Sequence, residues 1–204
     1  MAIMQQTDFV GLKAREAVFT AVDFESTGSV AGWEEEPWQI GVAEVAGGAL
    51  TGVQADGWLG VAAGRPFNPY APGRHAQVRT ELAAAEPWAR QWGTWKDWFA
   101  PGRALVAHNA STERKFLRKA APMHRFGPWV DTLALARRAL PGRKEYGLGA
   151  VCAAVGLEGE VAARCPGRTW HDALFDATAA GVFLVWLLGQ EGWGELSVED
   201  LASL

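Results

Sequence analysis

The spacing of apolar residues predicts strands in the first third of the chain. Residues 17–24 form a mostly apolar run rich in β-branched and aromatic side chains, and residues 37–45 and 49–60 repeat this pattern. A pair of glycines separates the second and third runs, which is typical of a hairpin turn. We therefore expect a meander of strands, followed by a loop at residues 65–73, where three prolines and a glycine occur.

Helical spacing begins near residue 80. Trp88, Trp92 and Trp95 are separated by four and three positions, which places them on one face of a helix and favours a core position. Pro87 is expected at the first turn of this helix, which is the second one within residues 80–99.

The rest of the chain alternates short apolar runs with helical segments. Strands are expected at residues 103–107 and 128–132, and helices at residues 111–120, 132–140, 146–155 and 172–188. The residues expected to cap helices are Ser111 or Thr112, Asp131 and Asp172. Strands that alternate with helices after a meander predict an α/β domain in which a mixed sheet is flanked by helices.

A length of 204 residues suits a single domain. We expect an N-terminal extension at residues 1–16, the domain itself at residues 17–189 and a short C-terminal tail at residues 190–204. The two cysteines lack the spacing of a metal site, and Cys152 lies in an apolar pattern that predicts a buried thiol. Neither a secretion signal nor a membrane-spanning segment is evident, so we expect a soluble cytoplasmic protein that does not bind membranes.

Charge is distributed unevenly along the chain. The formal net charge is −4, but residues 101–170 contain 12 lysines and arginines against 5 acidic residues. A locally basic surface on an acidic protein is able to guide a polyanion. It is equally compatible with an ordinary solvated surface.

Two carboxylates stand at the end of the first expected strand, in the segment DFESTG. Side chains at positions i and i+2 of a strand share a face, so Asp23 and Glu25 are expected to point together while Phe24 points away. Neighbouring carboxylates repel each other and favour a compensating cation, for which Mg²⁺ or Mn²⁺ is well suited. The alternative is a strand end followed by an ordinary polar turn.

Two further segments carry residues of the same chemistry. HNASTERKFL places Glu113 in the first turn of an expected helix, and TWHDALFDATAAGVF places His171 before a helix and Asp176 about one turn inside it. Carboxylates of this kind can hold two divalent ions for in-line displacement at a phosphodiester. The ordinary pKa of a histidine suits His171 for the role of general base.

Together, DFESTG, HNASTERKFL and HDALFDA resemble the three motifs of the DEDD 3′–5′ exonucleases. The nearer resemblance is to the DEDDh branch, which includes the proofreading (epsilon) subunit of bacterial DNA polymerase III and ribonuclease T. The resemblance implies a ribonuclease H-like fold and two Mg²⁺ or Mn²⁺ ions. It also implies that Asp23 bridges both metals, Glu25 and Asp176 complete the first metal site, Glu113 occupies the second and His171 is the base.

Glu113 departs from the family pattern, which has Asp at this position. The extra methylene adds about 1.5 Å of reach. Either an intervening water accommodates the longer side chain, or the second metal shifts and the chemistry slows. In the extreme case the chain is a nucleic-acid-binding module that has lost turnover.

Residues around the motifs are candidates for substrate contact: Phe24, Ser26, Thr27, Gly28, His75, His108 and Asn109. For His108 and Asn109 the alternative is a turn in which Asn satisfies backbone groups. Gly28 either needs a positive φ or lets a terminal nucleotide approach the backbone. Trp33 and Trp170 are the tryptophans expected to be exposed and available for stacking on a base.

These observations lead to one functional hypothesis and its rivals. The expected activity is metal-dependent 3′–5′ hydrolysis that releases nucleotides from single-stranded or frayed DNA ends. A 3′–5′ exoribonuclease is one alternative, because DNA and RNA are distinguished by contacts to the 2′-hydroxyl, which the motifs do not specify. A binding module is the other, because Glu113 departs from the family pattern. A polymerase partner is compatible with the resemblance, but no tethering tail is evident after residue 189.

Overall fold

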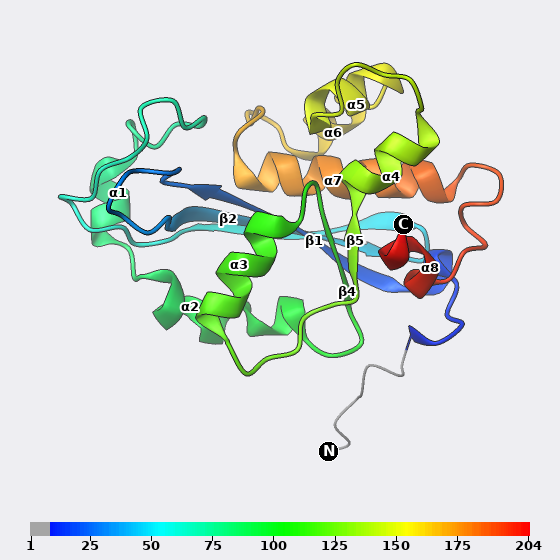
Figure 1. Ribbon diagram of the computed structural model, residues 1–204, viewed down its shortest axis with the longest axis horizontal. Coiled ribbons are helices and arrows are strands. Elements are labelled where there is room, and N and C mark those ends of the chain that lie inside the picture. The colour runs from blue at the N-terminus through cyan, green and yellow to red at the C-terminus, as the bar shows by residue number, and fades with distance from the viewer. Residues whose placement is uncertain (1–8) are drawn as a thin grey trace.

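The computed structural model describes residues 9–204, which form a five-stranded mixed sheet in the order β3-β2-β1-β4-β5 (Figure 1). The strands are β1 (Val18–Ser26), β2 (Pro37–Ala46), β3 (Ala49–Trp58), β4 (Ala104–Ala107) and β5 (Trp129–Asp131). The first three form an antiparallel meander, and β4 and β5 continue the sheet in parallel with β1. The predicted strands and the mixed α/β sheet are therefore confirmed.

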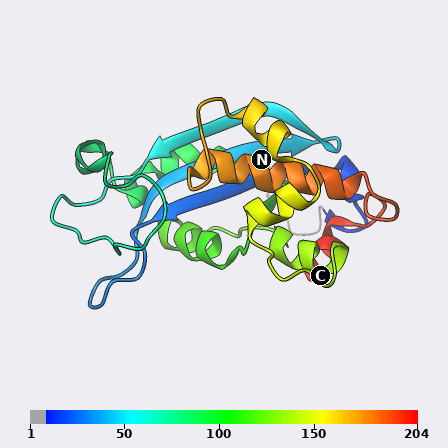
Figure 2. The same cartoon turned by 90° about the horizontal axis from the view of Figure 1, so that it is seen from above.

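Helices cover both faces of this sheet. They are α1 (Arg79–Ala84), α2 (Trp88–Trp95), η3 (Lys96–Phe99), α3 (Ser111–Ala120), α4 (Thr132–Ala139), α5 (Leu148–Ala154), α6 (Glu158–Arg164), α7 (Ala173–Leu188) and α8 (Val198–Ser203). One core cluster joins α2, η3 and α3 to one face, and a second joins α4 to α8 to the other. Figure 2 shows α7 lying across the strands, and it is the most extensively buried helix.

Alternation along β1 divides its side chains between these two cores. Phe19 and Ala21 belong to the cluster under α7, whereas Val22 and Phe24 belong to the cluster under α2 and α3. Positions 23 and 25 follow the first set, because side chains two residues apart share a face. The strand therefore directs its two carboxylates toward the N-terminal end of α7.

A glycine on β2 allows α7 to approach the sheet closely. Gly41 pairs with Asp23 in the β1–β2 register. A Cβ atom added at Gly41 would lie only 2.2 Å from the backbone of Ala173, the first residue of α7. A glycine inside a strand often marks such a close backbone approach.

Three details differ from the sequence-based expectations. The helical region 80–99 is divided into α1, α2 and η3, with Pro87 as the N-cap of α2 rather than inside its first turn. The short helices α6 and α8 were not expected. The expected cap of α3 by Ser111 or Thr112 is wrong: Ala110 is the N-cap and makes no side-chain cap.

α3 needs no cap from its own residues, because backbone N–H groups at its start are bound by a residue of β5. The Asp131 carboxylate accepts hydrogen bonds from the backbone N–H groups of Asn109 and Ala110, at 2.9 and 3.2 Å. The same carboxylate accepts from the Leu133 N–H and caps α4, as predicted. One aspartate thus organises two helix starts, and the predicted Asp172 cap of α7 is likewise confirmed.

The two flanks of the expected domain pack on the same core. Ala14 N–H donates to the Leu196 carbonyl at 2.8 Å, and Val198 N–H donates to the Leu12 carbonyl at 3.0 Å. Val198 and Leu201 of α8 are buried beside α7. Residues 190–204 are therefore a folded part of this unit, while the first half of the expected extension, residues 1–8, lies outside the described residues. The domain boundaries remain a prediction.

Among residues 9–204, no helix combines the length and the apolar character needed to span a bilayer.

We predict that Gly41→Ala lowers the free energy of unfolding by about 1–3 kcal/mol, because overpacking against Ala173 forces α7 to shift. Urea denaturation of the purified variant measures this change. The matched control is Gly93→Ala, since nothing lies within 4 Å of a Cβ added there. This control is expected to stabilise α2 by up to ~1 kcal/mol. Equal unfolding midpoints for Gly41→Ala and the parent would contradict the close approach.

Candidate active site

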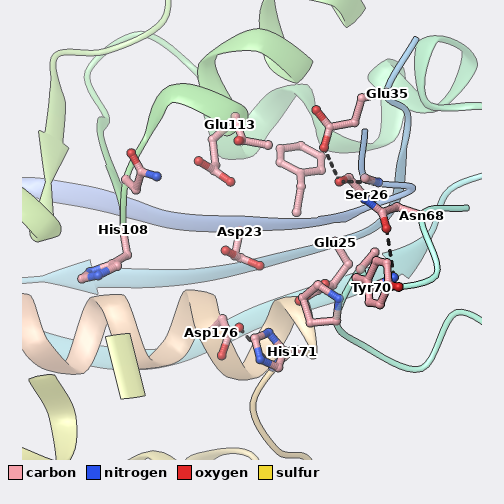
Figure 3. Close-up of a pocket in the computed structure, with 16 residues that line it drawn as sticks. Asp23, Glu25, Ser26, Glu35, Asn68, Tyr70, His108, Glu113, His171 and Asp176 are labelled. Atoms are coloured by element: carbon pink, nitrogen blue, oxygen red, sulfur yellow. Dashed lines mark hydrogen bonds between the residues drawn. The ribbon is translucent and has the colours of Figure 1, made fainter. Parts of the chain in front are cut away.

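The first wall of the site is the C-terminal end of β1. This strand pairs with β4 only over Phe19–Ala21, although it continues alongside β2 to Ser26. The edge of β1 beyond Ala21 is therefore left to be covered by other elements. Asp23 and Glu25 lie on this stretch and face α7 (Figure 3).

The N-terminal turn of α7 forms the second wall. His171 adopts a left-handed backbone conformation, with φ of 66°. Its N–H donates to Asp176 Oδ2 at 3.1 Å, so the residue before the helix and the first turn of the helix are locked together. Because α7 sits directly over Gly41, Asp176 and His171 come next to the carboxylates of β1.

A polar network outside the site holds this turn in place. The buried Asp172 carboxylate accepts from Arg168 Nη1 at 2.8 Å, from Gln39 Nε2 at 3.2 Å and from Arg74 Nη2 at 3.1 Å. Burial alone would raise the pKa of Asp172, but the bonds from Arg168 and Gln39 hold the pKa below its usual value. Arg168 also pairs with Asp56 of β3 at 2.9 Å, so the turn is fixed to two strands.

The third wall is the start of α3. The chain turns at Asn109 after β4, where φ is 66°. The Asp131 carboxylate accepts a hydrogen bond from the Asn109 N–H group. The helix then begins at Ser111, which places Glu113 in the first turn, where its side chain is buried. Figure 3 shows Glu113 across β1 from Asp176 and His171.

These walls enclose an open cavity of about 570 Å³. Its lining residues are Asp23, Phe24, Glu25, Ser26, Gly28, Glu35, Asn68, Tyr70, Ala71, Pro72, His108, Asn109, Thr112, Glu113, His171 and Asp176. All five residues of the expected catalytic set are therefore brought to one place. Within it, potential ligand atoms of Glu25, His171 and Asp176 lie within 4.8 Å of one another.

Burial and mutual repulsion disfavour negative charge in this cavity. Burial raises the pKa of Glu25 to about 8, and the charges of Asp176, Asp172 and Glu113 add to the effect. Burial likewise raises the pKa of Glu113 to about 8 and that of Asp176 to about 7. The pKa of Asp23 is raised well above its ordinary range by burial and then by Glu113.

The donor set fits a hard divalent cation. Among the described residues, Glu113 Oε2 and Asp176 Oδ1 are buried oxygens without a hydrogen-bond partner. Unpartnered buried carboxylate oxygens are strongly disfavoured unless a cation compensates them. Four carboxylates that face one cavity offer the oxygen ligands that Mg²⁺ and Mn²⁺ prefer. The residues present therefore match a metal site.

The other candidate residues divide into two groups. Ser26 and Gly28 line the cavity, and so does Phe24, although its ring packs mainly on Trp88 and Phe116. Thr27 is fully buried, and its hydroxyl accepts a hydrogen bond from the Glu36 N–H at 3.1 Å. The Thr27 side chain is therefore turned away from the cavity, and substrate contact at this position stays a prediction.

His75 is also placed differently from the expectation. Its ring stacks on Phe67 with a centroid distance of 4.7 Å and meets the edge of Trp38. It is absent from the cavity lining, because these two aromatic rings hold it in the loop that follows β3. Its contact with the expected substrate is not supported.

His108 and Asn109 both line the cavity. The two ring nitrogens of His108 are engaged, Nδ1 with Thr132 Oγ1 at 3.0 Å and Nε2 with the Tyr146 carbonyl at 2.8 Å. Because a carbonyl only accepts, Nε2 carries the proton. Burial lowers the pKa of His108, which favours the neutral form of the ring. His108 therefore links the end of β4 to α4 through Thr132 and to the turn before α5 through Tyr146.

Several residues of the site were not found from the sequence. Glu35, Asn68 and Tyr70 reach the rim from loops distant in sequence. Gly41 and Gln39 support the site from β2, where the Gln39 amide oxygen accepts from the Ala173 N–H at 3.3 Å. A glycine and a glutamine within an apolar strand were the available signals, whereas the loop residues carried none.

The two tryptophans expected at the surface behave differently. Trp33 has an exposed fraction of 54%, and its ring lies 4.9 Å from the Arg65 guanidinium. Trp170 is half-buried, because its ring packs on Phe175 at 4.9 Å. The expectation of exposure thus holds for Trp33 and is wrong for Trp170.

Comparison with known proteins agrees with this arrangement. A family model described as "Exonuclease" matches residues 20–182, which contain all three motifs. The chain therefore belongs to this exonuclease family, within the DEDD superfamily. The resemblance stated from the motifs is confirmed at this level.

Particular relatives can also be named. The chain is 29% identical to exodeoxyribonuclease 10 of Escherichia coli strain K12 over 142 residues, which is 67% of this chain and 56% of that protein. The match therefore spans little more than half of the curated relative. Exonuclease X, solved with 5′ overhanging duplex DNA, superposes with a TM-score of 0.67 at 24% identity, over 91% of this chain and 98% of the other.

A third similar structure extends the comparison. E. coli exonuclease I, solved with a 5cy-dT13 oligonucleotide, superposes with a TM-score of 0.64 at 15% identity and covers 88% of this chain and 42% of the other. Both superpositions show that the chain has the ribonuclease H-like fold of these exonucleases, as expected.

We predict that the metal-free protein loses stability as the pH rises from 5 to 8. The carboxyls of Glu25, Glu113 and Asp176 have pKa values of about 8, 8 and 7 when folded, against 4.5, 4.5 and 3.8 ordinarily. The folded state therefore retains protons that the unfolded chain releases in this window, and raising the pH favours unfolding.

Thermal melts at pH 5, 6.5 and 8 in a chelating buffer measure this effect. Mg²⁺ or Mn²⁺ should reverse it at pH 8, by ~2.7 kcal/mol at a concentration 100 times the dissociation constant. Asp23→Asn should raise the melting temperature of the metal-free protein at pH 8, because it removes one repelling charge. A melting temperature that changes neither with pH nor with Asp23→Asn would contradict the repulsion among the carboxylates.

Proposed function

We propose that this chain is a metal-dependent 3′–5′ exonuclease that releases nucleotides from single-stranded or frayed DNA ends. The observation that carries the proposal is the convergence of four carboxylates and His171 in one open cavity. Membership of the exonuclease family supports hydrolysis of a phosphodiester bond. The polarity and the substrate are part of the proposal.

Each acidic residue has a role in binding two divalent ions, Mg²⁺ or Mn²⁺. Asp23 would contact both ions, Glu25 and Asp176 the first and Glu113 the second. When bound, such ions compensate the carboxylates, polarise the scissile phosphate and lower the pKa of a bound water. The unpartnered oxygens of Glu113 and Asp176 support this assignment.

His171 is the proposed general base. Its imidazole lies at the cavity surface beside Glu25 and Asp176, and its backbone is fixed by the bond to Asp176 Oδ2. From this position the ring would accept a proton from the attacking water and release it to solvent. The hydrogen bonds of Asp172 to Arg168 and to the Leu174 N–H fix the turn on both sides of His171. They would therefore hold the imidazole ring in position relative to the phosphate.

DNA is the favoured substrate for two reasons. The similar protein from Escherichia coli, exodeoxyribonuclease 10, is named for its action on DNA, and the similar structures of exonucleases X and I were solved with DNA strands. A single-stranded or frayed end is favoured, because the cavity lies between the edge of β1, α3 and α7 and a terminal phosphate would need to separate from a paired strand to enter it. A polymerase partner is not proposed.

Turnover is favoured over a binding module by the position of Glu113. Its carboxylate reaches the same cavity as the other three acids, and its charge is one of the causes of the raised pKa of Asp23. The longer side chain is therefore directed at the site and is not displaced from it.

The proposal is tested with 5′-labelled single-stranded DNA incubated with Mg²⁺ or Mn²⁺. A descending ladder of products is expected, and Asp23→Asn should slow its appearance by at least ~100-fold, as for loss of a central charge in an active site. Asp97→Asn, an exposed acid on η3, is the matched control and should leave the ladder unchanged. RNA of the same sequence is digested in parallel. A ladder on RNA alone identifies the exoribonuclease, and binding without products on either strand contradicts turnover.

We further predict that Glu113→Asp alters the dependence of the rate on metal concentration. Shortening the side chain by about 1.5 Å moves one ligand. The concentration of Mn²⁺ that gives half-maximal rate should change several-fold, while Glu113→Gln should lower the rate at every concentration. Identical metal titrations for Glu113→Asp and the parent would show that Glu113 does not bind a metal ion.

A further inference from the structure

A basic turn lies next to the cavity and has no role in the site described above. It consists of Arg137 in the last turn of α4 and of Arg143 and Lys144 in the segment before α5, all with exposed side chains. Within residues 9–204, none of the three forms an ion pair with a carboxylate. Glu145 is the acidic neighbour within this segment.

The basic turn is ordered before any ligand binds. The Tyr146 hydroxyl donates to the Leu140 carbonyl at 2.8 Å and accepts from the Arg143 N–H at 3.2 Å. The Arg143 guanidinium also donates to the Ala150 carbonyl at 3.3 Å. The charged side chains are therefore presented by a closed loop, which lowers the entropy lost on binding.

His108 connects the basic turn to the cavity. Its ring lines the cavity, and its Nε2 donates to the carbonyl of Tyr146 at 2.8 Å. Arg137 is close enough to contribute to the lowered pKa of His108, after burial. The ring of Tyr146 lies 6.0 Å from the Arg137 guanidinium. The basic turn is therefore joined to the cavity through His108.

The opposite side of the cavity has a different charge arrangement. Glu35 lines the cavity and pairs with Lys115 of α3 at 2.9 Å, and Glu34 pairs with Lys119 at 3.0 Å. Figure 3 shows His108 and Glu35 on opposite sides of Asp23. Lys115 and Lys119 of α3 are thus already compensated by carboxylates on this rim.

We propose that the strand leading away from the 3′ end leaves the cavity past His108 and lays its phosphates on the basic turn of Arg137, Arg143 and Lys144. This inference rests on the proposed function, because it assumes that the 3′ end occupies the cavity. It assigns the path of the strand upstream of the reacting phosphate. Phosphate contacts of this kind position a strand without reading its sequence.

The test measures binding of a fluorescent 12-nucleotide single strand at a series of salt concentrations, in an Asp23→Asn background that prevents hydrolysis. The variant Arg137→Gln/Arg143→Gln/Lys144→Gln should reduce the slope of log Kd against log salt by ~2, since each phosphate contact of a single strand contributes about 0.7. The same arithmetic gives a roughly 100-fold weaker Kd at 0.1 M salt. The loss should increase with length from a dinucleotide to the 12-mer.

The matched control removes three exposed positive charges from the other side of the sheet, in Arg90→Gln/Lys96→Gln/Arg125→Gln. An equal loss in both triple variants, or an unchanged slope in the first, overturns the proposed path. Hydrolysis of thymidine 5′-(4-nitrophenyl phosphate) by the parent protein tests the proposed function separately. Because binding is measured without turnover, a failure of the ester assay and a failure of the path are distinguishable.

Discussion

Repulsion among buried carboxylates is the constraint on which this structure depends. Asp23, Glu25, Glu113 and Asp176 come from three separate elements, and within residues 9–204 none of them forms an ion pair with a basic side chain. Burial adds to the repulsion, because it removes the water that would screen these charges. A fold that brings such groups together has to hold each element from outside the cavity, and the surrounding structure does this.

The contacts that hold these elements in place are made by residues outside the cavity lining. Gly41 lets the backbone of α7 rest directly on β2, and Asp172 fastens the first turn of that helix through Arg168 and Gln39. Asp131 does the same for α3 and α4. The basic side chains nearest the first turn of α7, Arg168 and Arg74, pair with Asp172 and not with the acids of the cavity. The four acids therefore stay available to a cation, and without one the site is electrostatically unfavourable.

Local patterns were sufficient to predict the strands of a mixed sheet and to select five residues that meet in one cavity, while the catalytic roles of these residues stay a prediction. The period of two placed Asp23 beside Glu25, and the cap at Asp172 located His171 and Asp176 relative to α7. Contacts between distant segments were not predictable in this way. The α3 cap was assigned wrongly because its acceptor is Asp131 on another strand, and His75 was misplaced because its environment depends on Phe67 and Trp38.

The pairing of the two flanks has a consequence for how this unit can be joined to other proteins. Residues 12–14 and 196–198 are hydrogen-bonded to each other at the end of the sheet where β1 begins (Figure 1). The cavity is lined by the other end of β1, from Asp23 to Ser26. A polypeptide attached at Phe9 or after Leu204 would start on the same side of the molecule, with the length of β1 between it and the cavity. Fusion partners, surface tethers and labels therefore have two neighbouring points of attachment that leave the approach to the carboxylates open.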